Sequence, residues 1–402
     1  MSLSDRDIVC LSNHFWDERR FRKQEFMARF ARRNRVLYVE PSYSMARPPE
    51  AHLREVATNR HLVPRIEERE EGVHILKPPR ALPKWNHPRV DRLTYSWYGR
   101  VVERAARRLG FRDPIVWVYW PSWYAGIGAI EHGELVLDLT DDLGGFSGDW
   151  RARTEYVDGC VRGLIRDSDL LVVTAKTLLD KYGSLARRAV HVPNGFDPGL
   201  FSPELLDGGP PAPLRDVPRP ILGFTGTLFS FLDYDLLTRV AEVHADKSLV
   251  LVGPIEANMR ETVERLVRLP NVFHVERQPQ PAMPAYVAEF DVCLNPFRVD
   301  RVSHNVNPLK VYEYLAMGRP VVSTPMEALR VEELGGEIAF ADGPEAFCAE
   351  IDRALGDEVQ SGADRRRAAV AQYSWDRLFE RIDEACGAAL NGRAAAAARA
   401  ES

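Results

Sequence analysis

Short apolar runs alternate with amphipathic stretches through most of the chain. In the first half, the apolar runs predict strands at 7–12, 35–40, 72–77, 114–120, 134–140, 169–175 and 189–194. Apolar positions at helical spacing lie between most of them, at 23–33, 91–109, 150–167 and 176–183. Because the predicted strands are apolar on both faces, the alternation indicates a parallel sheet that helices cover on both sides.

Residues 201–219 interrupt this alternation. The segment is rich in proline and glycine and has no periodicity, which is typical of a linker. Strands are predicted again at 220–226, 248–253, 271–276, 291–297, 319–324 and 336–340. The pattern therefore predicts two α/β domains, 1–200 and 220–372, each a doubly wound, Rossmann-like sheet, facing each other across a cleft. We expect a closing helix at 373–392 that packs on the N-terminal domain, and a disordered tail at 393–402.

The composition narrows the class of protein. The net charge of −5 gives no basic field for nucleic acid, so no nucleic-acid partner is expected. The five cysteines have neither metal-binding nor disulfide spacing, which predicts buried, reduced thiols in an intracellular protein. No apolar run reaches the roughly 20 residues of a membrane span, and the N-terminus lacks a signal peptide. We therefore expect a cytoplasmic protein.

The stretch HNVNPLKVYEYLAMGRPVVST carries the most specific chemistry. Asn307 fits a helix N-cap, Pro308 the first helical position, and Gly318 the position after the helix. Lys310 would then lie in the first turn, where the helix dipole disfavours a cation by a few tenths of a kcal/mol unless an anion lies between them. The pattern predicts a phosphate or carboxylate site at this helix N-terminus.

Glu313 follows Lys310 by three residues, so the two side chains share a helix face. If Lys310 binds a diphosphate, Glu313 lies one turn deeper, where it could accept hydrogen bonds from a ribose diol. The alternative is an ordinary surface ion pair on a solvated helix. Because the flanking segments YEYLAMG and PVVST are apolar, we favour a nucleotide site.

The segment NPLKVYEYLAMGRPVVST is similar to the nucleotide-sugar-binding segment of GT-B glycosyltransferases, especially family 4 (group 1). Three further segments resemble, in the same order along the chain, other segments of that family: VPNGFDPGLF, ILGFTGTLFSFLDYDLL and YSWDRLFERI. The resemblance covers roughly 190–390. It implies transfer of a hexose from a nucleotide-diphosphate sugar to a cell-surface glycan or lipid-linked acceptor, in polysaccharide biosynthesis at the inner face of the cell membrane. It favours a UDP-sugar over a GDP- or dTDP-sugar, and no bound cofactor or metal.

The same resemblance implies a donor site within residues 220–340. Lys310 and the surrounding backbone would bind the diphosphate, and Glu313 would bind the ribose. The other donor-binding residues that it implies are Gly226, Thr227, Arg277, Gln278, Asn305, Asn307, Pro308 and Leu309. Of these, Arg277 and Gln278 would contact the base.

The chain departs from the family pattern in two places. Many family 4 members have a second glutamate eight residues before the ribose-binding one, where this chain has Asn305. Many also have an arginine and a lysine after the first strand of the second domain, and TLFSFLDY has neither. These departures leave open whether transfer would retain or invert the anomeric configuration. The sequence DYD at 233–235 resembles a GT-A metal motif, but Asp233 fits a helix N-cap better.

Candidate catalytic groups follow two predicted strands of the first domain. In LDLTDDLGGF, neighbouring carboxylates raise one another's pKa, so Asp141 or Asp142 could serve as the general base for the acceptor hydroxyl. Turn and capping chemistry is the alternative for both. His14 could bind the acceptor or act as a base, or it could be structural. The basic, aromatic segment 16–24 could contact an anionic acceptor or acidic lipid head groups as a peripheral membrane contact, or could be a solvated helix face.

Two other functions stay open. One is a degenerate GT-B domain that serves as a partner-binding subunit without catalysis, which Asn305 and the missing arginine and lysine favour. Lys310 and Glu313 oppose it, because a degenerate site has no reason to keep a lysine against the helix dipole. The other is a sugar-nucleotide 2-epimerase on the same fold, for which the sequence offers no specific motif.

Overall fold

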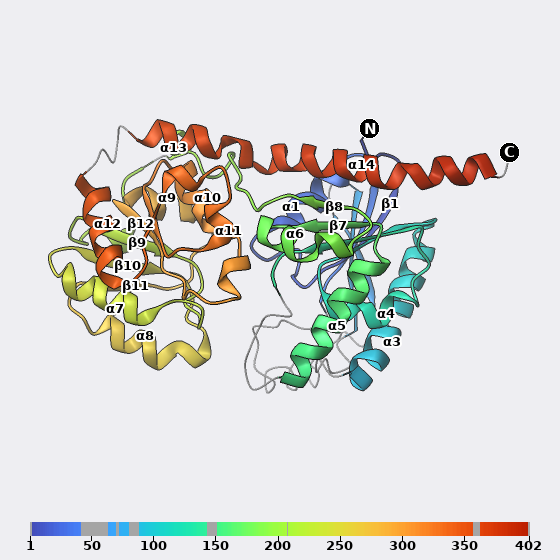
Figure 1. The fold of residues 1–402 in the computed structure, drawn as a ribbon, viewed down its shortest axis with the longest axis horizontal. Helices are drawn as coiled ribbons and strands as arrows, with labels where there is room; N and C mark the ends of the chain where they lie inside the picture. The colour runs from blue at the N-terminus through green and yellow to red at the C-terminus, as the bar shows by residue number, and fades with distance from the viewer. Residues whose placement is uncertain are drawn as a thin grey trace. The chain divides into compact units, whose positions relative to one another are not determined.

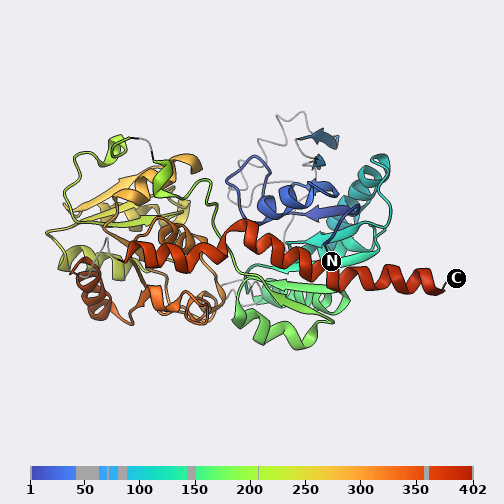
Figure 2. The ribbon, with the colours of Figure 1, turned by 90° about the horizontal axis from the view of Figure 1, so that it is seen from above.

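The computed structural model describes residues 2–41, 63–69, 72–79, 88–142, 151–206, 208–356 and 362–400 of the 402-residue chain, and the side chains of 151–153, 335 and 391–400 lie outside that description. The chain divides into two compact units, shown in Figures 1 and 2. The first comprises Met1–Val192 and Phe379–Ser402, and the second comprises Pro193–Leu378.

The described part of the first unit contains an eight-stranded sheet in the order β3-β4-β2-β1-β5-β6-β7-β8. Its strands are β1 (Asp7–Leu11), β2 (Arg35–Val39), β3 (Arg65–Glu68), β4 (Val73–Lys77), β5 (Ile115–Val118), β6 (Glu134–Leu139), β7 (Leu170–Val173) and β8 (Ala189–His191). Among these described strands, only the pair β3 and β4 is antiparallel. The helices are α1 (Arg22–Phe30), α3 (Pro88–Arg108), α4 (Tyr124–Ile127), α5 (Arg151–Asp167) and α6 (Lys176–Tyr182).

The second unit contains a parallel six-stranded sheet in the order β11-β10-β9-β12-β13-β14. Its strands are β9 (Ile221–Thr225), β10 (Ser248–Val252), β11 (Val272–Val275), β12 (Val292–Asn295), β13 (Val321–Ser323) and β14 (Ile338–Phe340). The helices are α7 (Tyr234–Val243), α8 (Arg260–Val267), α9 (Met283–Glu289), α10 (Leu309–Ala316), α11 (Glu327–Arg330), α12 (Pro344–Gly356) and α13 (Ala363–Val370). Figure 1 shows α7 and α8 on one side of this sheet and α10 and α13 on the other.

Both sheets reverse their strand order, the first between β1 and β5 and the second between β9 and β12. Right-handed crossovers then place helices on both faces of each sheet. The prediction of two doubly wound α/β domains is therefore confirmed. Each predicted strand is present and shorter than predicted, whereas β3 was not predicted. Residues 201–219, the predicted linker, lie within the second unit.

The helix α14 (Trp375–Ala400) begins in the second unit and continues in the first, and it extends through most of the predicted tail. Its contacts within the first unit involve both ring packing and a buried hydrogen bond. The Phe379 ring lies edge-on to Phe30, with 4.9 Å between the ring centroids. The backbone N–H of Leu3 donates to Asp383 Oδ1 at 2.8 Å. The helix thereby fixes the N-terminal segment of the chain.

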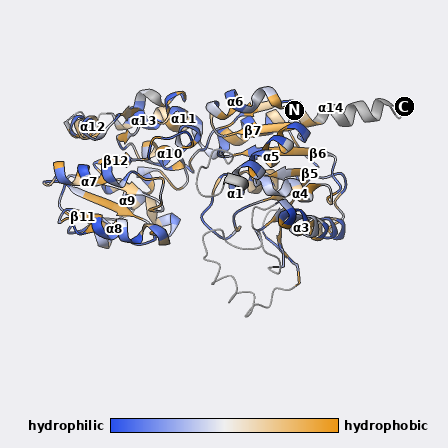
Figure 3. Ribbon diagram, turned by 60° about the horizontal axis from the view of Figure 1, so that its bottom comes forward, coloured by the Kyte–Doolittle hydropathy of each residue, from blue (hydrophilic) through white to orange (hydrophobic). Residues whose placement is uncertain are grey.

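Apolar side chains of the strands form the core of each unit, and Figure 3 shows most strands in the hydrophobic colour. The strands β1, β6, β9 and β10 are buried along their whole length, as expected for central parallel strands. All five cysteines are buried, as predicted, and all are free thiols. Burial raises the pKa of every one of these thiols.

Gly223 of β9 sets how closely the end of α9 can approach the sheet. A Cβ atom at this position would lie 2.0 Å from the Phe290 ring, which is itself fully buried. We expect Gly223→Ala to lower the free energy of unfolding by about 1–3 kcal/mol, because the ring has no room to retreat. Urea unfolding followed by circular dichroism measures this. Gly336→Ala is the control, since a Cβ there meets nothing within 4 Å; equal stability of the two variants would contradict the prediction.

Candidate functional site

The predicted site residues lie near the carboxyl ends of strands on both sides of each reversal in strand order. In the first unit, His14 follows β1 and Asp141 follows β6; in the second unit, Gly226 follows β9 and Lys310 lies in the helix after β12. Ligands of doubly wound folds bind at this edge of the sheet. The topology therefore gives each unit one candidate binding edge.

Lys310 lies in the first turn of α10, as predicted. Its Nζ is 4.6 Å from the ring centroid of Phe224 and 4.9 Å from that of Phe297. Aromatic faces attract an ammonium, so these rings, which flank the ends of β9 and β12, hold the charge in place. The result is a fixed cation at a helix N-terminus.

Two glycines let the backbone come close to this ammonium. Gly226 has φ +135°, and a Cβ there would lie 3.2 Å from Lys310 Cε and 3.3 Å from its Nζ. A Cβ at Gly253, after β10, would lie 2.0 Å from the carbonyl oxygen of Gly226. Glycine is therefore required where the loops after β9 and β10 meet beside Lys310. Such an arrangement permits close backbone approach to a bound phosphate.

Glu313 and Tyr314 lie further along α10. Glu313 is only 2% exposed. The Tyr314 hydroxyl accepts from the backbone N–H of Thr225 at 2.8 Å and is 3.0 Å from Thr225 Oγ1. These buried contacts fasten α10 to the end of β9. Lys310 and Glu313 are thus carried on one helix whose position is set by the sheet.

The prediction that Asn307 caps this helix is wrong. The N-cap is Pro308, and the helix has no side-chain cap. The Asn307 side chain instead donates to the Tyr312 hydroxyl at 2.8 Å, and Asn194 Nδ2 donates to the Asn307 carbonyl at 2.7 Å. Asn307 is used to attach the segment before α10 to the start of the second unit.

The other predicted donor residues are spread along the same edge. Thr227 is exposed, Leu309 is half-buried, and Asn305 ends a short 3-10 turn before α10, where its Nδ2 donates to the Arg301 carbonyl at 3.1 Å. Arg277 and Gln278 follow β11, two strands away from β9. The structure therefore brings Gly226 against Lys310 and places the predicted base contacts further along the edge.

Two of the three acids at the end of β6 are held in buried ion pairs. Asp138, which is 0% exposed, accepts from Arg22 Nε at 3.0 and 3.1 Å. Both oxygens of Asp142 lie 2.7 Å from Lys181 Nζ, and one also accepts from the Tyr182 hydroxyl. Because both Asp142 oxygens are occupied, Asp141 is the stronger candidate for a base.

Asp141, His14 and Lys23 form an electrostatic group. Asp141 is half-buried, and its Oδ2 accepts from Thr140 Oγ1 at 3.0 Å; burial raises its pKa, while this hydrogen bond and Lys23 act against the rise. Burial and then Lys23 lower the pKa of His14, whose Nδ1 is 3.6 Å from Glu18. The positive charge of Lys23 therefore acts to lower the pKa of both Asp141 and His14, the two candidate bases.

Sequence reasoning had placed Lys23 only in the basic segment 16–24. The structure corrects the view of that segment as a basic surface, since Arg22, Lys23 and the following Arg29 are all buried. One signal could have identified Lys23. It lies in the first turn of a helix that follows a buried strand, as Lys310 does.

The sequence DYD is a helix cap in the structure. Asp233 Oδ1 accepts from the backbone N–H of Leu236 at 2.9 Å, at the start of α7, as predicted. In the part of the chain that the structure describes, no group of three histidine, cysteine or acidic side chains is arranged to hold a metal ion. No helix within the same residues is long and apolar enough to cross a membrane.

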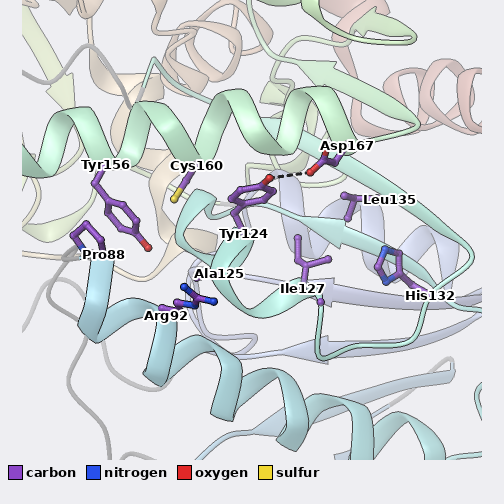
Figure 4. A pocket seen from close by; sticks show the side chains of 11 residues that line it. Pro88, Arg92, Tyr124, Ala125, Ile127, His132, Leu135, Tyr156, Cys160 and Asp167 are labelled. Atoms are coloured by element: carbon purple, nitrogen blue, oxygen red, sulfur yellow. Dashed lines mark hydrogen bonds between the residues drawn. The ribbon is translucent and has the colours of Figure 1, made fainter.

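A pocket of about 650 Å³ lies elsewhere on the first unit, lined by α3, α4 and α5 (Figure 4). Most of its lining is apolar, with Arg92 and His132 among the polar side chains. The Tyr124 hydroxyl donates to Asp167 Oδ2 at 2.9 Å at its wall. None of the predicted site residues lines this pocket, so it is separate from the candidate binding edges.

Comparison with known proteins finds a family match within the second unit. Residues 219–357 match the family described as Glycosyl transferases group 1. A Bacillus subtilis protein, whose name proposes a role as a teichuronic acid biosynthesis glycosyltransferase, is 29% identical over 241 residues, which are 57% of this chain and 59% of that protein. The match thus spans less than two thirds of the relative's length. The predicted resemblance to group 1 glycosyltransferases is confirmed.

Solved structures of low sequence identity share the fold over nearly the whole chain. The sucrose-phosphate synthase of Thermosynechococcus elongatus is 15% identical with a TM-score of 0.73, covering 99% of this chain and 100% of that one. A glycosyltransferase of Rickettsia africae is 12% identical with a TM-score of 0.66, covering 96% and 99%. An Anabaena protein in complex with UDP is 15% identical with a TM-score of 0.62, covering 96% and 100%. These likenesses show that the chain has the GT-B fold.

Proposed function

We propose that this chain is a glycosyltransferase that moves a sugar from a nucleotide-diphosphate sugar to an acceptor hydroxyl. The observation that carries the proposal is Lys310, held by two aromatic rings at a helix N-terminus without a side-chain cap and beside Gly226. A fixed cation, helix N–H groups and close backbone together suit a diphosphate. The family match over 219–357 includes this segment and supports the assignment.

The donor would bind along the carboxyl edge of the second sheet. Its diphosphate would lie on Lys310 and the N-terminus of α10, and its ribose on Glu313. Arg277 and Gln278 would contact the base, and Thr227 and Asn305 the remaining phosphate and sugar groups. Two neighbours of the same fold were solved with UDP and with UDP-2-fluoro glucose, which favours a UDP-sugar here. GDP- and dTDP-sugars are the competing donors.

The acceptor would bind at the first unit. Its oxygen attacks the anomeric carbon, the bond from that carbon to the diphosphate breaks, and the nucleoside diphosphate leaves. Lys310 and the helix N-terminus stabilise the negative charge on the departing diphosphate. The acceptor proton passes to Asp141, whose burial raises its pKa toward that of a useful base, to His14, or to the departing phosphate. Asp141 would serve an inverting transfer, and the departing phosphate a retaining one.

The B. subtilis relative supports an acceptor from the cell envelope, because its name refers to teichuronic acid biosynthesis. We therefore propose hexosyl transfer, without a metal, to a growing glycan or lipid-linked acceptor, at the inner face of the membrane. The exposed basic residues near α1, which are Arg20, Arg32, Arg33 and Arg35, would make any contact with acidic lipids.

Thermal unfolding with UDP, GDP, ADP, dTDP and CDP tests the proposal. A nucleotide present at 100 times its Kd should stabilise the protein by about 2.7 kcal/mol, and we expect the largest rise in Tm with UDP. No rise with any nucleotide would refute the donor site and favour a partner-binding subunit. Free epimerised sugar nucleotide formed without an acceptor would instead show an epimerase.

A further inference from the structure

Lys23 is a largely buried lysine whose ammonium contacts no carboxylate among the described residues. It is 6% exposed, and among the residues that the structure describes its ammonium has no hydrogen-bond partner and no carboxylate within 4.0 Å. The ammonium lies over the Tyr119 ring, whose centroid is 5.4 Å from Nζ. Removing an ammonium from water costs several kcal/mol unless an anion or good acceptors compensate. An aromatic face offsets only part of that cost.

The backbone adds a second cost at the same position. Lys23 is the second residue of α1, at the positive end of a nine-residue helix whose N-cap is Phe21. A cation there is disfavoured, whereas an anion is favoured. A bound anion would therefore remove both costs, as proposed for Lys310 in the second unit.

The nearby carboxylates already have other partners. Asp138 is paired with Arg22, and Asp142 with Lys181. Glu25, on the same helix, is 2.6 Å from Arg29. Asp141 accepts from Thr140 and lies beyond ion-pair distance of Lys23. None of these acids supplies the contact that the Lys23 ammonium lacks.

We propose that Lys23 binds an anionic group, a carboxylate or a phosphate, on the acceptor that receives the sugar. That the anion belongs to the sugar acceptor rests on the proposed function, whereas the anion site itself rests on the surroundings of Lys23. The first turn of α1, the loop that carries His14 and the end of β6 that carries Asp141 lie on the ligand edge of one sheet. An acceptor anchored by its charge on Lys23 would present a neighbouring hydroxyl to Asp141 or His14. The acceptor class is therefore an acidic or phosphorylated sugar.

This site predicts a pH dependence of anion binding. Burial lowers the pKa of Lys23 to about 8, with Arg22 acting in the same direction and Asp141, Asp138 and Cys10 against it. A bound anion raises that pKa, so binding takes up a proton near and above pH 8. Affinity should be constant below pH 8, fall by up to tenfold per pH unit between pH 8 and the raised pKa of the complex, and level off above that. Burial lowers the pKa of His14 and raises the pKa values of Cys10 and Tyr119. All three pKa values thereby move away from the pH range in which Lys23 titrates.

Thermal unfolding of Lys23→Met separates a binding role from a structural one. If no protein group compensates the ammonium, its removal should leave Tm unchanged or raise it. The matched control is Lys181→Met, which breaks the pair with fully buried Asp142 and should lower Tm clearly. An equal fall in Tm for both variants would overturn the proposal, because Lys23 would then be a structural partner of Asp141.

Nuclear magnetic resonance of the full chain, labelled with ¹³C at lysine Cε, tests the anion directly. The sequence has only seven lysines, and Lys23→Met assigns the signal of interest. We expect glucuronate or glucose 6-phosphate to shift that signal and raise the pKa of Lys23 by at least about one unit, with no effect of glucose. The anion that acts distinguishes a carboxylate from a phosphate. If neither anion moves the signal while UDP still raises Tm, the anion site is refuted and the donor site stands.

Discussion

Replacing Lys310 by alanine should abolish the stabilisation of the protein by its nucleotide and lower the transfer rate about 100-fold or more. The ammonium lies at the N-terminus of α10, where the departing diphosphate would carry its charge. Removing one preorganised donor to a developing anion typically costs a factor of about 10²–10³ in rate. Glu313→Gln should weaken nucleotide binding with less effect on the chemical step, because a ribose contact is made equally in the ground and transition states.

Thermal unfolding with and without the nucleotide, together with kcat and KM for transfer, measures these effects. Lys247→Ala is the matched control, since it removes the same charge in the same unit but precedes β10, at the opposite edge of the sheet. It should leave both nucleotide binding and transfer unchanged. Full nucleotide stabilisation of Lys310→Ala would place the donor elsewhere.

Breaking the buried pair of Arg22 and Asp138 by removing one partner should strongly destabilise the first unit. Arg22→Met would leave the fully buried Asp138 carboxylate without the Nε–H from which both its oxygens accept, and we expect a loss of about 3–5 kcal/mol in the free energy of unfolding. Arg22 Nη1 also donates to the Val192 carbonyl at 2.8 Å, so the end of β8 would lose a contact as well.

Urea unfolding compares this variant with Arg35→Met, which breaks the pair of half-exposed Arg35 with Asp7 and should cost less, because Asp7 keeps the hydrogen bond from the Arg112 backbone N–H. The double variant Arg22→Met/Asp138→Leu should recover most of the loss, because it removes the uncompensated charge. If Arg22→Met is no less stable than Arg35→Met, leaving Asp138 without Arg22 costs less free energy of unfolding than its burial predicts.

Most strands could be read from the sequence because they are continuous apolar runs, and the central ones are buried along their whole length. The strand β3 was missed for the same physical reason, since its residues, Arg65–Glu68, are mostly charged and only partly buried. Such an edge strand pairs through its backbone, antiparallel to β4, and leaves no hydrophobic pattern to read.

The sequence could predict the site residues whose roles depend on their neighbours along the chain, but not those whose roles depend on tertiary contacts. Lys310 and Glu313 lie three residues apart on one helix, whereas Gly226 was implied by the family resemblance, and the structure brings Gly226 against Lys310. Asn307 was misread because its amide is taken by Tyr312 and its carbonyl by Asn194, a tertiary contact that N-cap preference does not describe. The burial of Lys23 was equally hidden, because sequence alone does not show which lysines the fold covers.

The burial of all five thiols has a practical consequence for measuring motion. Every thiol pKa is raised, so the reactive thiolate is scarce at neutral pH and alkylating dyes should react slowly with the folded protein. One cysteine introduced at an exposed position of each unit would therefore label above a low native background. Fluorescence energy transfer between the two dyes could then follow the distance between the units as nucleotide and acceptor are added.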